Sequence, residues 1–197
     1  MRVLVAEDDA VVALGLAERL RSLGHEPIGP ACDGEQAIEM ARASLPDLYL
    51  FDIEMPGVDG LEAATRLAGE GLRRPVVVVT GVDDPGLVER SIASGVSAYL
   101  MKPLDSRELD AAVQLAAARH AEFQALEAEV DRAQQALEDR KLVERAKGLL
   151  MSALDLSEQD AFRRLQVTAR ERNLRLAEVA ARIVEQQSLL EPKRTRS

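Results

Sequence analysis

The sequence has few of the residues that crosslink a chain or carry it across a membrane. A single cysteine, Cys32, in 197 residues excludes an intramolecular disulfide and a cysteine-ligated metal cluster. No stretch approaches the roughly 18 uninterrupted apolar residues of a membrane-spanning helix. Met1 and Arg2 lead into a short apolar strand-like run and then into acids, without a signal segment. We therefore expect a cytoplasmic protein with a packed core, for which a hydrophobic content of 47% is sufficient.

Positive charge is scarce in the first part of the chain. Residues 1–137 hold 12 Lys and Arg against 24 Asp and Glu, a balance of −12, whereas residues 138–197 hold 13 against 10, a balance of +3. The acidic part should repel nucleic acids, and the second part should not. A balance of +3 is too small to establish nucleic-acid binding by charge alone.

Short apolar runs alternate with segments of helical periodicity over residues 1–118. The predicted strands are 2–6, 26–31, 48–51, 75–80 and 97–101, and the predicted helices are 10–23, 35–44, 60–68, 85–94 and one that opens after Pro103. Five strands alternating with five helices predict an α/β fold with a doubly wound, five-stranded parallel sheet. Right-handed crossovers bring the carboxyl ends of the strands to one edge, where such sheets bind ligands.

Charged and polar side chains collect at that edge. Six of them follow four of the strands, namely Glu7, Asp8, Asp9, Asp52, Thr80 and Lys102. Crowded carboxylates repel one another unless a hard cation lies among them, and oxygen ligands with places left for water suit Mg²⁺. Asp52 could then attack a phosphoryl group while Lys102 and the cation take up its charge and Thr80 donates a hydrogen bond. Simpler explanations stay open, since the acids could cap helices and Lys102 could be a surface lysine.

Four motifs lie at these strand ends: Glu7-Asp8, Asp52-Ile53-Glu54-Met55-Pro56-Gly57-Val58-Asp59-Gly60, Thr80-Gly81 and Lys102-Pro103. Together they resemble the receiver domain of two-component response regulators, and the resemblance covers residues 1–118. It implies a flavodoxin-like fold in which Asp52 accepts phosphate from a sensor histidine kinase. No second catalytic group accompanies Asp52, so we expect no enzymatic activity beyond phosphotransfer and autodephosphorylation at this residue.

The same resemblance implies a role for each residue of the edge. The implied Mg²⁺ ligands are the side chains of Glu7, Asp8 and Asp52 and the main-chain carbonyl of Glu54. Thr80 and Lys102 would bind phosphoryl oxygens, and Gly81 would leave room for the incoming group. Lys102-Pro103 would be a cis peptide. Tyr99 would turn inward on activation, although it could also be an ordinary core aromatic of an edge strand.

Residues 105–139 contain neither proline nor glycine, and they predict one long helix that overlaps the last helix of the receiver. Apolar residues recur on it every seven positions, at Leu109, Ala116, Phe123, Val130 and Leu137. A second line is only half apolar and consists of Ala112, Arg119, Leu126 and Ala133. The spacing favours a modest coiled coil and a homodimer. The alternative is a stripe that packs back on the receiver.

Three helices are predicted after residue 138, over 139–154, from Ser157 to about 172, and over 174–187. Asn173 should end the second. Nine basic residues lie on the first two of these helices and in the turn that follows them, namely Arg140, Lys141, Arg145, Lys147, Arg163, Arg164, Arg170, Arg172 and Arg175. Arginine suits phosphates and base edges, but interleaved acids are equally typical of an ordinary solvated face. Phe162 is the only aromatic of this part that is available for stacking on bases, and it could instead belong to the core.

Three ordered blocks carry a second resemblance: Glu144-Arg145-Ala146-Lys147-Gly148-Leu149-Leu150-Met151, Leu156-Ser157-Glu158-Gln159-Asp160-Ala161-Phe162-Arg163-Arg164-Leu165 and Asn173-Leu174-Arg175-Leu176-Ala177-Glu178-Val179-Ala180. They look like the ANTAR domain of transcription antitermination regulators and span residues 138–187. That family implies dimeric binding of paired RNA hairpins, which prevents a terminator stem from forming. Residues 191–197 should be a disordered tail.

These features predict a response regulator whose phosphorylation on Asp52 controls RNA-hairpin binding and antitermination. Its expected partners are a sensor histidine kinase, RNA hairpins and a second copy of the chain, with no membrane involved. Two alternatives stay open. The chain could be a DNA-binding response regulator, although the turn at 155–157 is not an evident helix-turn-helix. It could also be a protein-docking regulator that binds no nucleic acid.

Overall fold

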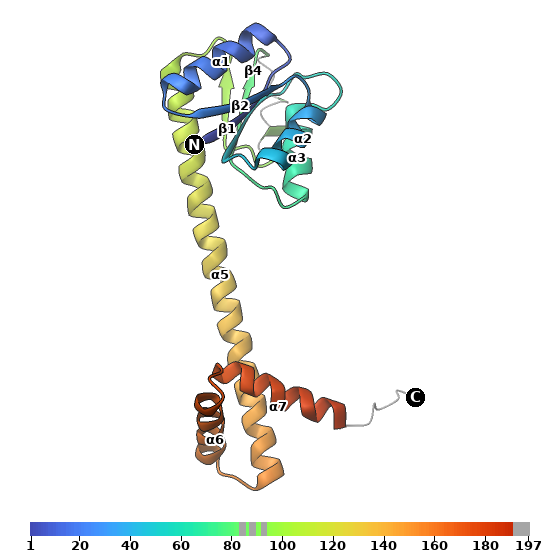
Figure 1. Cartoon of the computed structure of the whole chain (residues 1–197), viewed down its shortest axis with the longest axis vertical. Helices are drawn as coiled ribbons and strands as arrows, with labels where there is room; N and C mark the ends of the chain where they lie inside the picture. Colours follow the sequence, from blue (N-terminus) through green and yellow to red (C-terminus); the bar gives the residue numbers. More distant parts are fainter. Residues whose placement is uncertain (83–85, 87–89, 92–93, 191–197) are drawn as a thin grey trace, which may run out of the picture. The chain divides into compact units, whose positions relative to one another are not determined.

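The computed structural model describes residues 1–82, 86, 90, 91 and 94–190, in two compact units, Met1–Ala125 and Leu126–Ser197 (Figure 1). Each unit has its own hydrophobic core. Among the described residues, no helix combines the length and the apolar character that crossing a membrane requires.

The first unit is built on a five-stranded parallel sheet. Its strands are β1 (Arg2–Ala6), β2 (Glu26–Ala31), β3 (Leu48–Asp52), β4 (Val76–Thr80) and β5 (Ala98–Met101), in the order β2-β1-β3-β4-β5. The helices are α1 (Ala10–Ser22), α2 (Gly34–Ser44), α3 (Gly60–Gly69) and the start of α5 (Ser106–Leu154). The predicted α/β class and parallel sheet are confirmed. The helix predicted over 85–94 lies largely outside the described residues.

Alternating side chains of the buried strands build a core on each face of the sheet. Tyr49 and Phe51 of β3 pack with residues of α2 and α3, whereas Leu48 and Leu50 pack with residues of α1 and α5. Figure 1 shows α2 and α3 side by side, away from α1 and α5. All five residues of β3 and of β4 are buried. Strands buried on both faces read as unbroken apolar runs, which is why the sequence located them to within one residue.

The third strand extends one residue beyond its predicted end. Asp52 belongs to the ladder and lies opposite Val79 of β4, and its side chain is buried. The carboxylate is therefore fixed by the sheet itself rather than by the turn that follows.

Aspartates begin the first three helices of the sheet unit. Asp9 accepts hydrogen bonds from the backbone N–H groups of Val11 and Val12 at the start of α1, and these bonds lower the pKa of Asp9. Asp33 and Asp59 cap α2 and α3 in the same way. The sequence left open that Glu7 and Asp8 cap α1. In the structure Asp9 caps it instead, and its carboxylate accepts both bonds.

Helix α5 is a single element of 49 residues, so the predicted connector and the first helix after it are continuous. Leu109 and Ala116 are the first two of the apolar residues that recur every seven positions, and both are completely buried against the sheet. The alternative of a stripe packed on the receiver is therefore the one that holds for this part of the helix. Val130 and Leu137 are 53% and 54% exposed, so only the later part of the line is available to a partner.

The second unit packs the end of α5 with α6 (Glu158–Glu171) and α7 (Leu176–Leu190). Ala146, Leu165, Val179 and Ala180 form the centre of its core. Ser157 caps α6 by accepting from the N–H of Asp160, as the sequence predicted. The predicted end of α6 at Asn173 is explained by the left-handed backbone of this residue, with φ 51°. The predicted tail, 191–197, lies outside the described residues.

Gly60 gives a test of how tightly the chain folds around Asp52. A Cβ at Gly60 would overlap the carbonyl oxygen of Asp52, whereas one at Gly69, at the other end of α3, would meet no described atom within 4 Å. We expect Gly60→Ala to lower the free energy of unfolding by about 1–3 kcal/mol and Gly69→Ala to leave it unchanged or raised. Urea unfolding followed by tyrosine fluorescence measures this, because both tyrosines of the chain, Tyr49 and Tyr99, lie in the first unit. Equal free energies of unfolding for the two variants would show that the backbone near Asp52 and Gly60 can move apart at no cost.

Candidate functional site

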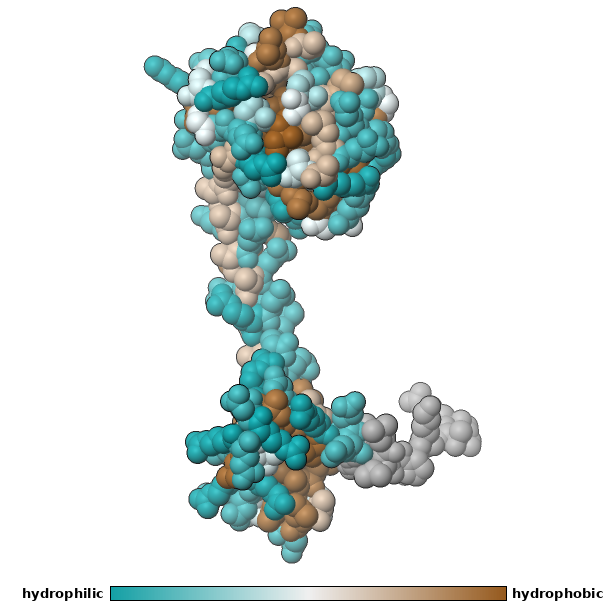
Figure 2. Space-filling model, viewed as in Figure 1, coloured by the Kyte–Doolittle hydropathy of each residue, from teal (hydrophilic) through white to brown (hydrophobic). Residues whose placement is uncertain are grey.

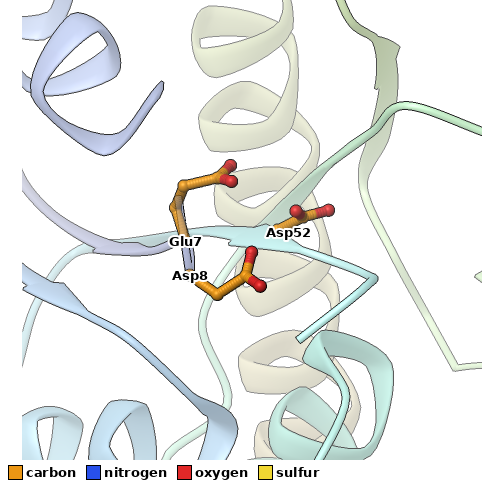
Figure 3. A group of neighbouring side chains, drawn as sticks. All are labelled: Glu7, Asp8 and Asp52. Atoms are coloured by element: carbon orange, nitrogen blue, oxygen red, sulfur yellow. The ribbon is translucent and has the colours of Figure 1, made fainter. Parts of the chain in front are cut away.

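The carboxyl edge of the sheet brings together an amine and two buried carboxylates. Lys102, just after β5, places its Nζ 2.8 Å from Oδ2 of Asp52. The same nitrogen lies 2.9 Å and 2.7 Å from the two carboxylate oxygens of Glu7, which follows β1. Figure 3 shows the carboxylate of Asp8 on the same side of the sheet edge as those of Glu7 and Asp52. Residues about fifty positions apart in sequence thus meet at one point.

Backbone hydrogen bonds hold the strand ends that carry these groups. The N–H of Glu7 donates to the carbonyl of Ala31 at 2.9 Å, and the N–H of Lys102 donates to the carbonyl of Thr80 at 2.8 Å. The Asp52 Oδ1 atom accepts from the N–H of Glu54 at 3.2 Å. Lys102-Pro103 is a cis peptide, as the resemblance implied. The side chains are therefore positioned by the sheet and its first loop residues.

Burial and pairing act in opposite directions on the two charged partners. Burial raises the pKa of Glu7, and the nearby charge of Asp52 adds to this, while the hydrogen bond from Lys102 opposes it. Burial alone lowers the pKa of Lys102, but its hydrogen bonds to Asp52 and Glu7 outweigh the burial, so its pKa is raised. Lys102 is therefore charged at neutral pH, and it is the group that keeps the two carboxylates together.

The donor set fits a hard divalent cation. Oxygens of Glu7, Asp8 and Asp52 lie within 4.8 Å of one another, with Glu7 and Asp52 buried and Asp8 exposed. Three carboxylates facing one ammonium group leave a formal charge of about −2, which a divalent ion would neutralise. The exposed side at Asp8 leaves room for water ligands. These three side chains would hold the ion, and the carbonyl of Glu54 stays a prediction as a further ligand.

Three other predicted residues surround this point. Thr80 is fully buried at the end of β4, and its hydroxyl oxygen accepts from the N–H of Val82 at 3.1 Å. Apart from its two chain neighbours, no described residue has an atom within 4 Å of the position that a Cβ would take at Gly81. Tyr99 is half-buried and its hydroxyl donates to the carbonyl of Val82 at 3.2 Å. Thr80 and Tyr99 therefore contact the same loop residue.

The basic residues predicted for the second unit differ in their surroundings. Eight of them are exposed, namely Arg140, Lys141, Arg145, Arg163, Arg164, Arg170, Arg172 and Arg175. Lys147 is only 8% exposed, and its Nζ lies 2.9 Å from Glu144 and 2.7 Å from Glu158. These bonds link α5 to α6 and raise the pKa of Lys147. Its charge is thus used inside the bundle, which the sequence could not reveal.

Comparison with known proteins defines the class of both units. The family model of the response regulator receiver domain matches residues 3–114, and the ANTAR domain model matches residues 131–184. The receiver domain of the putative response regulator NarL from Mycobacterium tuberculosis aligns with a TM-score of 0.56 and 32% identity, covering 59% of this chain and 94% of that one. The first unit is a receiver domain.

The chain belongs to the response regulators that join a receiver domain to a C-terminal ANTAR domain. It is 44% identical over 184 residues to the transcriptional regulatory protein PdtaR of Mycobacterium tuberculosis, covering 93% of this chain and 89% of that protein. It is 35% identical over 114 residues to the transcriptional regulatory protein DesR of Bacillus subtilis, covering 57% of this chain and 56% of that protein. The second likeness is confined to about half of each chain, whereas the first extends over both domains.

Lys102→Met tests whether the ammonium group offsets the burial of two carboxylates. We expect the free energy of unfolding to fall by about 2–3 kcal/mol at pH 7 without divalent ions. This value is below that of a fully buried ion pair because the lysine side chain is 21% exposed. The folded pKa of Glu7 lies above its ordinary value of 4.5, so the stability it contributes is present below 4.5 and is lost as the pH rises through the folded pKa. The loss in Lys102→Met should therefore be smaller at pH 4.5 than at pH 7.

Arg21→Met is the control for this substitution. Arg21 pairs with Glu18 on the surface of α1, with both side chains more than half exposed. Its loss should change the unfolding free energy by no more than about 0.5 kcal/mol. Urea titrations followed by tyrosine fluorescence compare the variants. If Lys102→Met lowered the free energy of unfolding equally at both pH values, the effect would not come from the charge of the Glu7 carboxylate.

Proposed function

We propose that this response regulator is phosphorylated on Asp52 by a sensor histidine kinase in the cytoplasm and that the phosphorylated form binds RNA hairpins to prevent transcription termination. The observation that carries the proposal is that the Asp52 carboxylate contacts Lys102 and lies beside the acids Glu7 and Asp8, in a chain whose second unit is an ANTAR domain. Neither feature alone connects a phosphorylatable side chain to an RNA target.

Phosphotransfer would use Asp52 as the nucleophile. A carboxylate oxygen of Asp52 forms a bond to phosphorus while the bond from phosphorus to the imidazole nitrogen of the kinase phosphohistidine breaks, and the histidine leaves. A bound Mg²⁺ would supply charge neutralisation for the phosphoryl oxygens. Lys102 already contacts Asp52 and can turn its amine to one of those oxygens. The hydroxyl of Thr80 accepts from Val82 and so keeps its own proton to donate.

The phosphorylated site would act on the rest of the unit through the loop after β4. Thr80 and Tyr99 both bond to Val82, one to its N–H and the other to its carbonyl. A Thr80 hydroxyl drawn towards the phosphoryl group changes the position of Val82, and Tyr99 must then change its hydrogen bond. This chain of contacts gives the predicted inward turn of Tyr99 a physical cause.

The exposed arginines of the second unit would form the RNA surface. Arg163 and Arg164 of α6 line a concavity of about 500 Å³ with Thr168, which adds a hydroxyl. Hydrophilic side chains cover much of the face of this unit shown in Figure 2. Guanidinium groups bind phosphates in pairs of hydrogen bonds, so such a surface suits the closely spaced phosphates of paired RNA. The proposed surface contains the eight exposed residues of the predicted basic set and leaves out the buried Lys147.

A short stripe on α5 would join two copies of the chain. Leu126, Val130, Ala133 and Leu137 follow one another at intervals of four, three and four residues, which is the spacing of a coiled-coil seam. All four are exposed, Leu126 to 62%. Two short stripes of this kind bury little surface, so we expect a weak dimer that phosphorylation of Asp52 favours.

RNA affinity tests the proposed control. For the full-length chain we expect affinity for a paired hairpin RNA to rise several-fold with a small-molecule phosphodonor and Mg²⁺, and to fall steeply with salt because counterions are released. Asp52→Asn and Asp8→Asn should not respond to the donor. Asp9→Asn removes the same charge next to the site but keeps a good helix cap, so it should respond as the parent does. Fluorescence anisotropy at several salt concentrations measures these affinities.

The contacts of the second unit are tested in the same titrations. Arg163→Gln should lower the slope of log affinity against log salt by about 1, whereas Arg42→Gln, which loses a receiver ion pair with Glu70, should not. Mass spectrometry of Asp52 after donor treatment separates failed phosphorylation from failed coupling. Affinity that ignores the donor while Asp52 is phosphorylated would refute the switch, and equal binding of duplex DNA would refute the RNA target.

Sedimentation of variants tests the proposed seam. With beryllium fluoride as a phosphate mimic, we expect the parent chain to sediment as a dimer and Val130→Glu to stay monomeric, because a charge in the seam is not paired across it. Ala128→Glu adds the same charge on the opposite side of the helix and should dimerise normally. Dimerisation of Val130→Glu at the parent's concentration would place the interface elsewhere.

A further inference from the structure

Besides the site around Asp52, the receiver unit has a pocket at the opposite end of the sheet, here called the second pocket. It has a volume of about 350 Å³ and is entered between the residues that precede β4, the residues that precede β5, and α5. Its charged walls are Arg73 and Arg74 before β4 and Arg119 on α5, and its aromatic walls are Tyr49 and Phe123. Pockets of this size hold small organic ligands in many proteins.

The charge of this pocket is the reverse of that of its surroundings. Residues 1–125 hold 11 Lys and Arg against 21 Asp and Glu, a balance of −10. Three of those cations line the pocket, together with His120, and no acidic residue is among its described lining residues. An acidic domain that gathers arginines into one concave site concentrates anions there.

The three arginines also differ from others in the unit in their pairing. Arg42, Arg66 and Arg90 are each neutralised by a carboxylate within 2.7 Å. In the described part of the chain, no carboxylate lies within 4.0 Å of a side-chain nitrogen of Arg73, Arg74 or Arg119. Their charge is therefore available to a ligand.

Neutral groups hold the walls of the pocket in place. The guanidinium of Arg74 donates to the carbonyls of Pro46 and Arg73, each at 2.9 Å, and these bonds orient it without cancelling its charge. The guanidinium of Arg73 lies 5.8 Å from the ring centre of Phe123. Tyr49 donates to the carbonyl of Leu72 at 2.8 Å, and burial raises its pKa to about 12, so it brings no negative charge.

We propose that this pocket binds a small phosphate-bearing ligand, with the phosphate among Arg73, Arg74 and Arg119. Three guanidinium groups match a phosphate monoester, with its charge of about −2, better than they match a single carboxylate. The ring of Phe123 offers a face on which a ligand base can stack. The shared chemistry is the phosphate, which could come from inorganic phosphate or from a nucleotide.

Calorimetric titration of the full-length chain tests the site with three probes, adenosine monophosphate, inorganic phosphate and adenosine. We expect the two phosphate-bearing probes to bind and adenosine to give no heat. Arg119→Gln and Arg73→Gln should each weaken binding at least about tenfold, a change of about 1.4 kcal/mol. Tighter binding of the nucleotide than of phosphate identifies an organic ester as the ligand, and equal binding identifies phosphate itself.

Two control variants make the outcome specific. Arg107→Gln removes an exposed arginine from the first turn of the same helix, and Arg163→Gln removes one from the proposed RNA surface. Both should bind the probes like the parent chain, and circular dichroism checks that every variant is folded. The proposal is overturned if no phosphate-bearing probe binds at millimolar concentration, if both pocket variants bind normally, or if Arg163→Gln alone abolishes binding.

Discussion

The receiver unit depends on one lysine that is shared by two buried carboxylates. Without Lys102, the sheet edge would bring Glu7 and Asp52 together with their desolvation uncompensated, and each ion would cost several kcal/mol. With it, the edge still carries an excess of negative charge once Asp8 is counted. Lys102 therefore stabilises the edge enough for the domain to fold, and the remaining negative charge can attract a divalent cation. Under the proposed function, a phosphoryl group on Asp52 would compete with Glu7 for the same amine.

The sheet and the residues at its edge could be read from the sequence because each depends on local information. Strands buried on both faces are unbroken apolar runs, and parallel topology then places whatever follows them at one edge. The meeting of Glu7, Asp52 and Lys102 follows from that topology alone. The distinction between Asp8 and Asp9 did not follow, because both are exposed acids after β1 and only the geometry shows that Asp9 is used as a helix cap.

What the sequence could not give is the identity of packing partners. A stripe of apolar residues spaced seven positions apart on α5 can pack against a second helix or against a sheet. In the structure Leu109 and Ala116 pack against the sheet. Charge has the same ambiguity, since Lys147 is one of several basic residues in the sequence but forms ion pairs within the bundle. The arginines of the second pocket form no motif because Arg73 and Arg119 are 46 positions apart and meet only through the fold.

Helix α5 is the element that the receiver and the second unit share. Lys102 and Leu104 precede its first residue, Ser106, one in the site and the other in the core, and the helix then packs on the sheet through Leu109 and Val113. The same helix continues without a break to Leu154, where its last turns belong to the core of the second unit. A ligand in the pocket beside Arg119 would contact the same helix further along. If both proposals hold, phosphate at Asp52 and a ligand at the pocket would influence each other through the packing of α5, and their coupling would then be reciprocal.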